Sequence, residues 1–230
     1  MNQFLETSIF FGVMVSLLSY GIGVWLKAKC KLAVFNPLLL SIIVTIIVLV
    51  LTGHDYDQYY EGAKYISYLL TPATVCLAIP LYEQLEILKK NWKAILSGIL
   101  GGVIASLTTI LLLVLFFHLT HEEYVTFLPK SITTAIGMDV SSELGGYVSI
   151  AVAVIILTGV LGNVLGELVF KLFRITEPIA RGVALGTSAH AIGTAKAMEL
   201  GEVEGAISSL SIVVAGIITV VGASVFAQFL

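Results

Sequence analysis

The chain has 230 residues, of which 58% are hydrophobic and only 12% are charged. A soluble domain carries roughly 25% charged residues, so this composition excludes a soluble globular protein and favours an integral membrane protein. The formal net charge of −3 is uninformative, because the signal lies in where the charges are placed along the chain.

Five long apolar runs predict membrane-spanning helices. Each approaches the ~17–25 residues that a helix needs to cross the hydrocarbon core of a bilayer. The runs cover about residues 7–26, 36–52, 93–117, 147–170 and 203–229. We therefore expect an all-α polytopic membrane protein that forms a single integral membrane domain over residues 1–230.

Nine of the twelve Lys and Arg residues fall into three short loops between these runs. Basic residues beside a span mark its cytoplasmic end, so these loops are expected in the cytoplasm. The loops contain Lys27, Lys29 and Lys31; Lys89, Lys90 and Lys93; and Lys171, Arg174 and Arg181. The acidic or neutral loops at about 55–61, 122–123 and 199–204 are then expected on the outer side, mainly because they lack basic residues.

This assignment requires two further crossings through less apolar segments. Residues 63–84 must cross inward and residues 182–200 must cross outward. The stretch 126–146 begins and ends outside, so it is expected to be re-entrant or interfacial. About seven crossings follow, with the N-terminus outside and the C-terminus in the cytoplasm.

The two additional crossings are both interrupted by helix-breaking residues. Pro72 and Pro80 lie in the first, and Gly186 and Gly193 lie in the second. With opposite directions of crossing, the halves at about 36–117 and 147–229 are expected to be inverted repeats. Gly- or Pro-interrupted segments at corresponding positions indicate the binding site of a secondary transporter. The alternative is that these residues only kink ordinary packed helices.

A polar stretch at 128–137 is the first candidate binding segment. Lys130 would supply a positive charge, and Ser131, Thr133 and Thr134 would supply hydroxyls and free N–H groups beside it. Together these groups suit a small carboxylate. The alternative is that Lys130 extends to the outer headgroups.

The broken crossings supply the remaining candidates. His190 titrates near physiological pH and could carry a coupled proton, with Asp139 and Glu143 as further coupling-ion candidates. An unwound turn near Gly193 could bring His190 and Lys196 together. The alternatives are a neutral histidine between helices, a Lys196 that extends to the outer surface, and carboxylates close to that surface. The other substrate-binding candidates are Pro72, Thr74, Thr187, Ser188, Gly193, Thr194 and Lys196.

The sequence lacks the common short motifs of enzymes and of cofactor- or metal-binding proteins. We find no phosphate-binding loop, dinucleotide fingerprint, nucleophile elbow or metal-ligand spacing, so we expect no enzyme activity, cofactor or metal. The glycines in 98–102 and 159–166 lie inside apolar runs, where small residues usually let helix backbones approach. Glu167 is expected to form an ordinary pair with Lys171, four residues on.

Three blocks of sequence resemble a known family. PATVCLAIPLY (72–82), LPKSITTAIGMDVSSELGG (128–146) and PIARGVALGTSAHAIGTAKAMELGEVEGA (178–206) are similar to the shared blocks of the LrgB/CidB family. The resemblance runs across nearly the whole chain. It implies a multi-pass protein of the bacterial inner membrane that acts with a small holin-like membrane partner of the LrgA/CidA type.

Two functions remain open. The first is a secondary carrier, which the polar broken segments favour. The resemblance, to a family that includes bacterial pyruvate carriers and a plastid glycolate/glycerate carrier, implies small monocarboxylates such as pyruvate, glycolate or lactate as its substrates. The second is an antiholin-like or holin-like accessory protein that modulates murein hydrolases, autolysis and programmed cell death without transport. The lipid bilayer is an expected partner in both, nucleic acid in neither, and a homo-oligomer is left open.

Overall fold

The computed structural model describes residues 10–30, 36–76 and 78–230, with the side chains of Leu70 and Thr74 also outside the description. Every regular element in these ranges is helical. Five of the described helical stretches are long and apolar enough to cross a membrane, at Phe10–Cys30, Tyr56–Glu83, Leu85–Phe117, Val148–Leu172 and Glu202–Phe229, and Pro37–Thr52 is a shorter apolar helix. The expected all-α polytopic membrane class is confirmed.

The chain forms two compact units, Met1–Cys76 and Leu77–Leu230, which we describe separately. Whether both belong to one integral domain over 1–230 stays a prediction. The first unit contains α2 (Phe10–Cys30), α3 (Pro37–Thr52), α4 (Tyr56–Ser67) and α5 (Leu70–Cys76). The second contains α6 (Ala78–Glu83), α7 (Leu85–Phe117), α8 (His121–Phe127), α9 (Thr134–Glu143), α10 (Val148–Leu172), α11 (Pro178–Leu200), α12 (Glu202–Phe226) and η1 (Ala227–Phe229).

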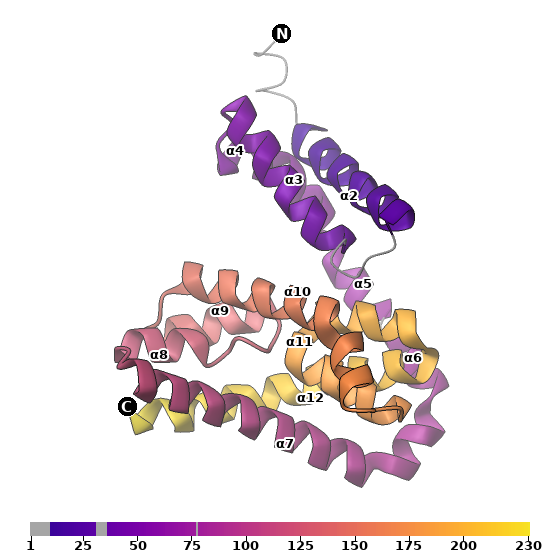
Figure 1. Cartoon of the computed structure of the whole chain (residues 1–230). Coiled ribbons are helices and arrows are strands. Elements are labelled where there is room, and N and C mark those ends of the chain that lie inside the picture. Colours follow the sequence, from indigo (N-terminus) through magenta and orange to yellow (C-terminus); the bar gives the residue numbers. More distant parts are fainter. Residues whose placement is uncertain (1–9, 31–35, 77) are drawn as a thin grey trace. The chain divides into compact units, whose positions relative to one another are not determined.

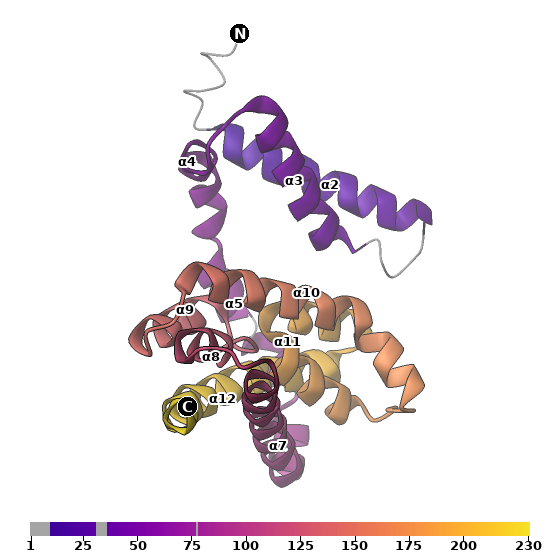
Figure 2. The ribbon, with the colours of Figure 1, turned by 60° about the vertical axis from the view of Figure 1, so that its left-hand side comes forward.

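In the first unit, α2 packs along α3 (Figures 1 and 2). The side chain of Asn36 accepts hydrogen bonds from the N–H groups of Leu38 and Leu39 and so caps α3, whose first residue is Pro37. Gly23 of α2 lies directly against Pro37, since an added methyl group would be 2.6 Å from the Pro37 carbonyl oxygen. Small residues therefore set the close approach of these two helices.

Helix α11 of the second unit is not a straight helix. Ala189 has φ −130° and ψ 15°, and His190 has φ 42° and ψ −137°, so the chain reverses between them. Thr194, after the reversal, shares a 2.7 Å hydrogen bond with Ser208, and Gly186, before it, packs on the carbonyl oxygen of the same serine. Residues 178–188 and 191–200 are thus two antiparallel arms, which we call the α11 hairpin.

Both ends of the α11 hairpin lie at the start of α12. Gly182 faces the Glu204 carbonyl oxygen, and Gly205 faces Met198. Arg181 also forms an ion pair of 3.9 Å with Glu204. The predicted outward crossing over residues 182–200 is therefore wrong, because this segment returns to the end from which it starts. The error arose because the loop at 199–204 lacks basic residues, and a lack of basic residues does not by itself place a loop on the outer side.

The reversal also changes the direction of the last span. Gly98 and Gly102 of α7 face Val183 and Thr187 of the first arm, while Gly182 and Gly186 of that arm face the start of α12. Helices α7 and α12 consequently run in the same direction (Figure 1). The inverted relation expected between 36–117 and 147–229 is not found for their final spans.

A second hairpin comprises α8, the connection 128–133 and α9, which we call the α8–α9 hairpin. Helices α8 and α9 lie side by side (Figures 1 and 2). Thr126 accepts a 2.7 Å hydrogen bond from the Tyr147 N–H, and Gly137 packs toward Pro129. Residues 126–146 thus fold back on themselves, as a re-entrant segment would, and their position relative to a bilayer stays a prediction.

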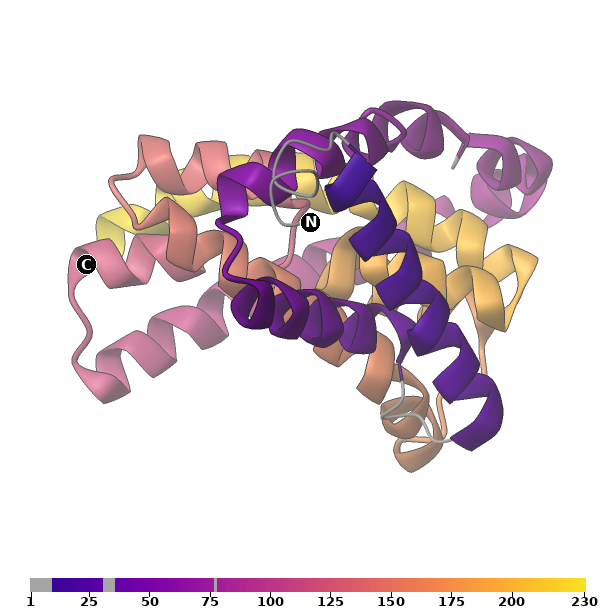
Figure 3. The same cartoon turned by 90° about the horizontal axis from the view of Figure 1, so that it is seen from above.

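The C-terminal end of α12 lies beside the α8–α9 hairpin (Figure 3). The Tyr124 hydroxyl donates a 3.0 Å hydrogen bond to the Phe226 carbonyl oxygen. One face of α7 completes the core there with residues repeating every three or four positions. These buried residues are Ile95, Ile99, Val103, Leu107, Ile110 and Val114.

Candidate functional site

The tips of the two hairpins both lie beside the middle of α7. Ser131, at the tip of the α8–α9 hairpin, lies 3.3 Å from Ser106. Thr187, near the tip of the α11 hairpin, faces Gly102, one helical turn before Ser106. The hairpins approach this level from opposite ends of α7, so the turns at their two tips lie at a similar level along α7.

A pocket of about 290 Å³ opens between α10 and the two hairpin tips. Its polar lining consists of Lys130, Thr158 and Ser188. The remainder is Leu161, Gly162, Leu165, Gly166, Val169, Phe170, Ala184 and Leu185. Mostly apolar walls with a few convergent polar groups are the usual composition of a small-molecule site.

Lys130 supplies the charge of this pocket. Its ammonium donates hydrogen bonds to Ser131 at 3.0 Å and to Ser106 at 3.3 Å. Within the described parts of the chain, no carboxylate forms an ion pair with Lys130. Ser106 lies about 16 Å along the axis from the end of α7. The side chain therefore lies against the middle of this helix rather than extending to its end.

The other candidates from the α8–α9 hairpin differ in position. Ser131 is buried between Lys130 and Ser106. Thr133 is the N-cap residue of α9 and Thr134 its first residue, and both are partly exposed at the tip. Asp139 and Glu143 lie on exposed parts of α9. Of the candidates described in this hairpin, Lys130 is therefore the one that lines the pocket, and Ser131 contacts its ammonium; Thr133, Thr134 and the two carboxylates are not among the lining residues.

In the first arm of the α11 hairpin, only one of two adjacent candidates reaches the pocket. Ser188 lines it, with its hydroxyl donating to the Ala184 carbonyl oxygen at 2.6 Å. The Thr187 side chain is buried against α7 and donates to the Val183 carbonyl oxygen at 2.7 Å. Ser188 is therefore the better placed of the two for contact with a ligand.

His190 forms the turn of the α11 hairpin and is buried. Its Nε2 atom lies 3.0 Å from the Ile155 carbonyl oxygen, and Gly159 packs against the imidazole ring. The reversal occurs at Ala189 and His190, so the prediction of an unwound turn near Gly193 is wrong. Gly193 instead lies in the second arm, where an added methyl group would be 2.4 Å from the Leu185 carbonyl oxygen. Thr194 points to α12.

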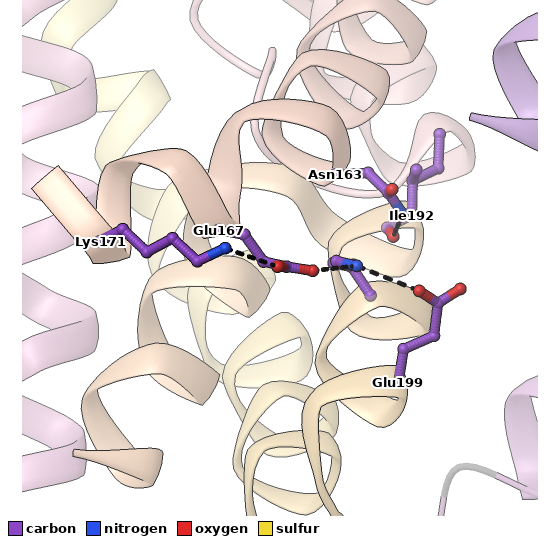
Figure 4. Close-up of polar contacts among 6 residues, drawn as sticks. Asn163, Glu167, Lys171, Ile192 and Glu199 are labelled. Atoms are coloured by element: carbon purple, nitrogen blue, oxygen red, sulfur yellow. Dashed lines mark hydrogen bonds and ion pairs between the residues drawn. The ribbon is translucent and has the colours of Figure 1, made fainter. Parts of the chain in front are cut away.

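A chain of ion pairs joins the second arm to α10, and Figure 4 labels its members Glu167, Lys171 and Glu199. Lys196 lies between the two glutamates. Its Nζ atom lies 2.5 Å from Glu167 and 3.1 Å from Glu199, and Glu167 also pairs with Lys171 at 3.7 Å. The predicted Glu167–Lys171 pair is confirmed. His190 and Lys196 are not brought together, because their contacts on α10, Ile155 and Glu167, are about 18 Å apart along that helix.

Two candidates belong to the first unit. Pro72 lies in α5 and is exposed. Thr74 falls in the same helix, but its side chain lies outside the described residues. Their proposed part in the site therefore stays a prediction.

Two site residues were missed in the sequence. Ser106 and Thr158 each occur as a small polar residue within a long apolar run, at about 93–117 and 147–170. Such residues are common in membrane helices, where they bond to their own backbone or to a neighbouring helix. The signal that separates Ser106 from the others is its contact with Lys130, which depends on the fold.

The glycines of α10 set the hairpin against the pocket wall. A methyl group added at Gly162 would lie 2.4 Å from Cβ of Ala189, and one at Gly166 would lie 3.0 Å from Leu185. Together with Gly98 and Gly102, these residues confirm that the two glycine-containing stretches permit close approach of helices. All the contacts described for these four glycines are with α11 of the second unit.

Comparison with known proteins places the chain in one family. The sequence profile of the LrgB-like family matches residues 16–229. The antiholin-like protein LrgB of Bacillus subtilis (strain 168) is 40% identical over 224 residues, which cover 97% of each chain. The proteins of the same name from Bacillus mycoides (strain KBAB4) and Bacillus cereus (strain B4264) are 39% identical over 222 residues, 96% of each chain. No solved structure matches.

Proposed function

This chain belongs to the LrgB-like family, and from that premise we propose that it is a secondary carrier for small monocarboxylates such as pyruvate, glycolate or lactate. The observation that carries this proposal is Lys130, an ammonium without a described carboxylate partner, at a pocket between two opposed hairpin tips. A lysine that is held inside a membrane domain without a counter-ion is costly, and binding an anion offsets that cost.

The pocket supports a carrier in a second way. It runs from Lys130 along α10 to Val169 and Phe170, toward the end where the α11 hairpin begins and ends. On the other side of Lys130, the α8–α9 hairpin is densely packed, because its residues Tyr124, Val125 and Leu128 are fully buried. Access from one end at a time is what alternating access requires.

The basic loops also support an orientation for the carrier. With Lys171 and Arg181 in the cytoplasm, the hairpin geometry gives six crossings, and α12 would leave the cytoplasm. We propose that both termini lie outside, in place of the cytoplasmic C-terminus expected from the sequence, and that the pocket opens to the cytoplasm. His190, Asp139 and Glu143 stay candidates for a coupling proton or cation.

The test is uptake of labelled pyruvate into vesicles across an imposed pH gradient, with and without a small holin-like partner. We expect saturable uptake that unlabelled lactate competes for, that Lys130→Ala abolishes, and that Lys90→Ala leaves unchanged. Lys90 is an exposed lysine near the start of α7 and serves as the matched control. Normal uptake by well-inserted Lys130→Ala protein would remove Lys130 from the site.

A second candidate function is an antiholin-like accessory role, in which the protein modulates a holin-like partner and, through it, cell lysis. The observation that favours it is the shared name of the relatives, antiholin-like protein LrgB, at about 40% identity over nearly the full chain. The comparisons support this function better than transport. The two are compatible, since carboxylate export could itself alter lysis.

The same variants separate the two functions. Cells that lack the gene would be complemented with wild-type protein, Lys130→Ala or Lys90→Ala, and lysis and pyruvate flux would be measured together. The accessory role would be assigned if Lys130→Ala protein still controls lysis but no longer supports pyruvate flux. It would also be assigned if wild-type protein controls lysis without any pyruvate flux. Loss of both with Lys130→Ala alone would make transport the primary activity.

A further inference from the structure

In the described structure, Ser106 reaches the lining of the pocket through Lys130. Its hydroxyl, on the apolar helix α7, lies 3.3 Å from the Lys130 ammonium and 3.3 Å from the Ser131 hydroxyl. Ser131 is itself 3.0 Å from the same ammonium. The three polar groups form a triangle that joins α7 to the tip of the α8–α9 hairpin.

The hydrogen bonds of the triangle leave one N–H donor of the Lys130 ammonium for a ligand. An ammonium group has three N–H donors and no acceptor. The two serine oxygens accept two of the three hydrogen bonds, and the described residues give no partner for the third. Because Lys130 also lines the pocket, the third donor is available to a ligand there. Neither serine neutralises the charge, as a carboxylate would.

The two serines are not equivalent. Ser131 is the neighbour of Lys130 in sequence and moves with it, so it cannot fix the ammonium relative to the pocket wall. Ser106 lies on a different helix, whose Gly102 contacts the first arm of the α11 hairpin one turn earlier. The position of the ammonium relative to the rest of the pocket therefore depends on Ser106.

From these contacts we infer that Ser106 is a positioning residue, which holds the Lys130 ammonium toward the pocket so that it can bind the carboxylate of the substrate. This inference rests on the proposed carrier function. Without the Ser106 hydroxyl, the long lysine side chain gains alternative rotamers, and its charge is held less well at the substrate position.

The test compares Ser106→Ala, Ser106→Thr and Ser97→Ala in reconstituted full-length protein. Ser97 is an exposed serine of the same helix whose hydroxyl bonds only to the Ala94 carbonyl oxygen in the described structure, so it is a matched control. We expect Ser106→Ala to raise KM for pyruvate about ten-fold with little change in Vmax, as a hydrogen bond to a charged group implies. Ser106→Thr keeps a hydroxyl and should restore most of the affinity, and Ser97→Ala should resemble wild type.

A second measurement reports on Lys130 itself. Reconstituted protein would be treated with trinitrobenzenesulfonate, and the modified lysines located by peptide mass spectrometry. Pyruvate should protect Lys130 in wild type, and about ten-fold more pyruvate should be needed in Ser106→Ala. If Ser106→Ala does not insert, Ser106→Cys gives the same comparison, because a thiol is a weak acceptor of nearly the same size.

The outcomes are distinguishable. An unchanged KM together with unchanged protection in Ser106→Ala would overturn the positioning role while leaving the carrier intact. A fall in Vmax at constant KM would also overturn it, since it would indicate a structural effect on turnover. If wild-type protein shows neither uptake nor protection, the carrier function itself fails, and the role of Ser106 fails with it.

Discussion

The Nζ atom of Lys196 lies 2.5 Å from Oε1 of Glu167, and this ion pair joins the second arm of the α11 hairpin to α10. The pair continues to Glu199 on one side and Lys171 on the other. The Lys196 side chain is 14% exposed, against 79% for Lys171. A neighbouring contact, from the Asn163 amide to the Ile192 carbonyl oxygen at 2.9 Å, holds the same arm one turn closer to its tip.

Removing the Lys196 charge should loosen this arm. We expect Lys196→Ala to destabilise the protein by about 1–2 kcal/mol, between the values for exposed and for buried pairs, because of the two described ion pairs of Glu167 the longer one, with Lys171, remains. The measurement is the thermal unfolding midpoint in detergent. Lys171→Ala, at the exposed end of the chain of ion pairs, should change it far less. Equal effects of the two substitutions would contradict this account.

A methyl group at Gly162 should prevent the hairpin from seating on α10. The added carbon would lie 2.4 Å from Cβ of Ala189, which is closer than van der Waals contact allows. We expect Gly162→Ala to cost at least ~1–3 kcal/mol, as over-packing does, and to lower the yield of folded protein. The measurement is the monodisperse fraction on size-exclusion chromatography, together with the unfolding midpoint.

Gly101 provides the control for Gly162. It lies in α7, and an added methyl group meets no atom within 4 Å. Gly101→Ala should therefore be neutral or stabilise by up to ~1 kcal/mol, because alanine favours a helix over glycine. A well-folded Gly162→Ala protein with the stability of Gly101→Ala would show that the close approach at Ala189 is not required.

The hairpin also predicts which loops share a side of the membrane. In a variant with Cys30 and Cys76 replaced by serine, single cysteines would be placed at Lys171, Glu202 and Glu122, all of them exposed. Because both ends of the hairpin lie together, an impermeant thiol reagent should label positions 171 and 202 from one side and position 122 from the other. Labelling of position 202 from the same side as position 122 would contradict the hairpin and would support a crossing of the membrane by residues 182–200.

The Tyr124 hydroxyl should stabilise the closed end of the second unit. Tyr124 is fully buried, and its hydroxyl donates to the Phe226 carbonyl oxygen at 3.0 Å. Tyr124→Phe should cost about 1 kcal/mol, since the carbonyl loses its side-chain partner while the ring stays packed. The unfolding midpoint measures this, with the exposed Tyr147→Phe as control. The interpretation fails if both substitutions have the same small effect.

The sequence by itself determined the class of the protein and the segments that matter. Apolar runs longer than a soluble helix requires have no stable place outside a bilayer, so composition and run length were sufficient for the all-α membrane class. Lys130 also stood out without a structure, because a lysine between apolar runs is costly wherever the chain folds. The same holds for the interrupted stretches 126–146 and 182–200, whose Gly, Ser and Thr content excludes an ordinary lipid-facing helix.

Only the tertiary structure decided the path of the chain through 182–200. Whether a polar helix crosses or folds back depends on the backbone dihedrals of Ala189 and His190, which are stabilised by their contacts with Gly159 and Gly162 of α10. Counting basic loops cannot detect a reversal that returns the chain to its starting side. The partners of Lys130 and Lys196 were likewise decided by packing, since Ser106 lies 24 residues from Lys130 and Glu167 lies on another helix from Lys196. Sequence spacing carries information about contacts within one helix, whereas contacts between helices exist only once the hairpins are packed.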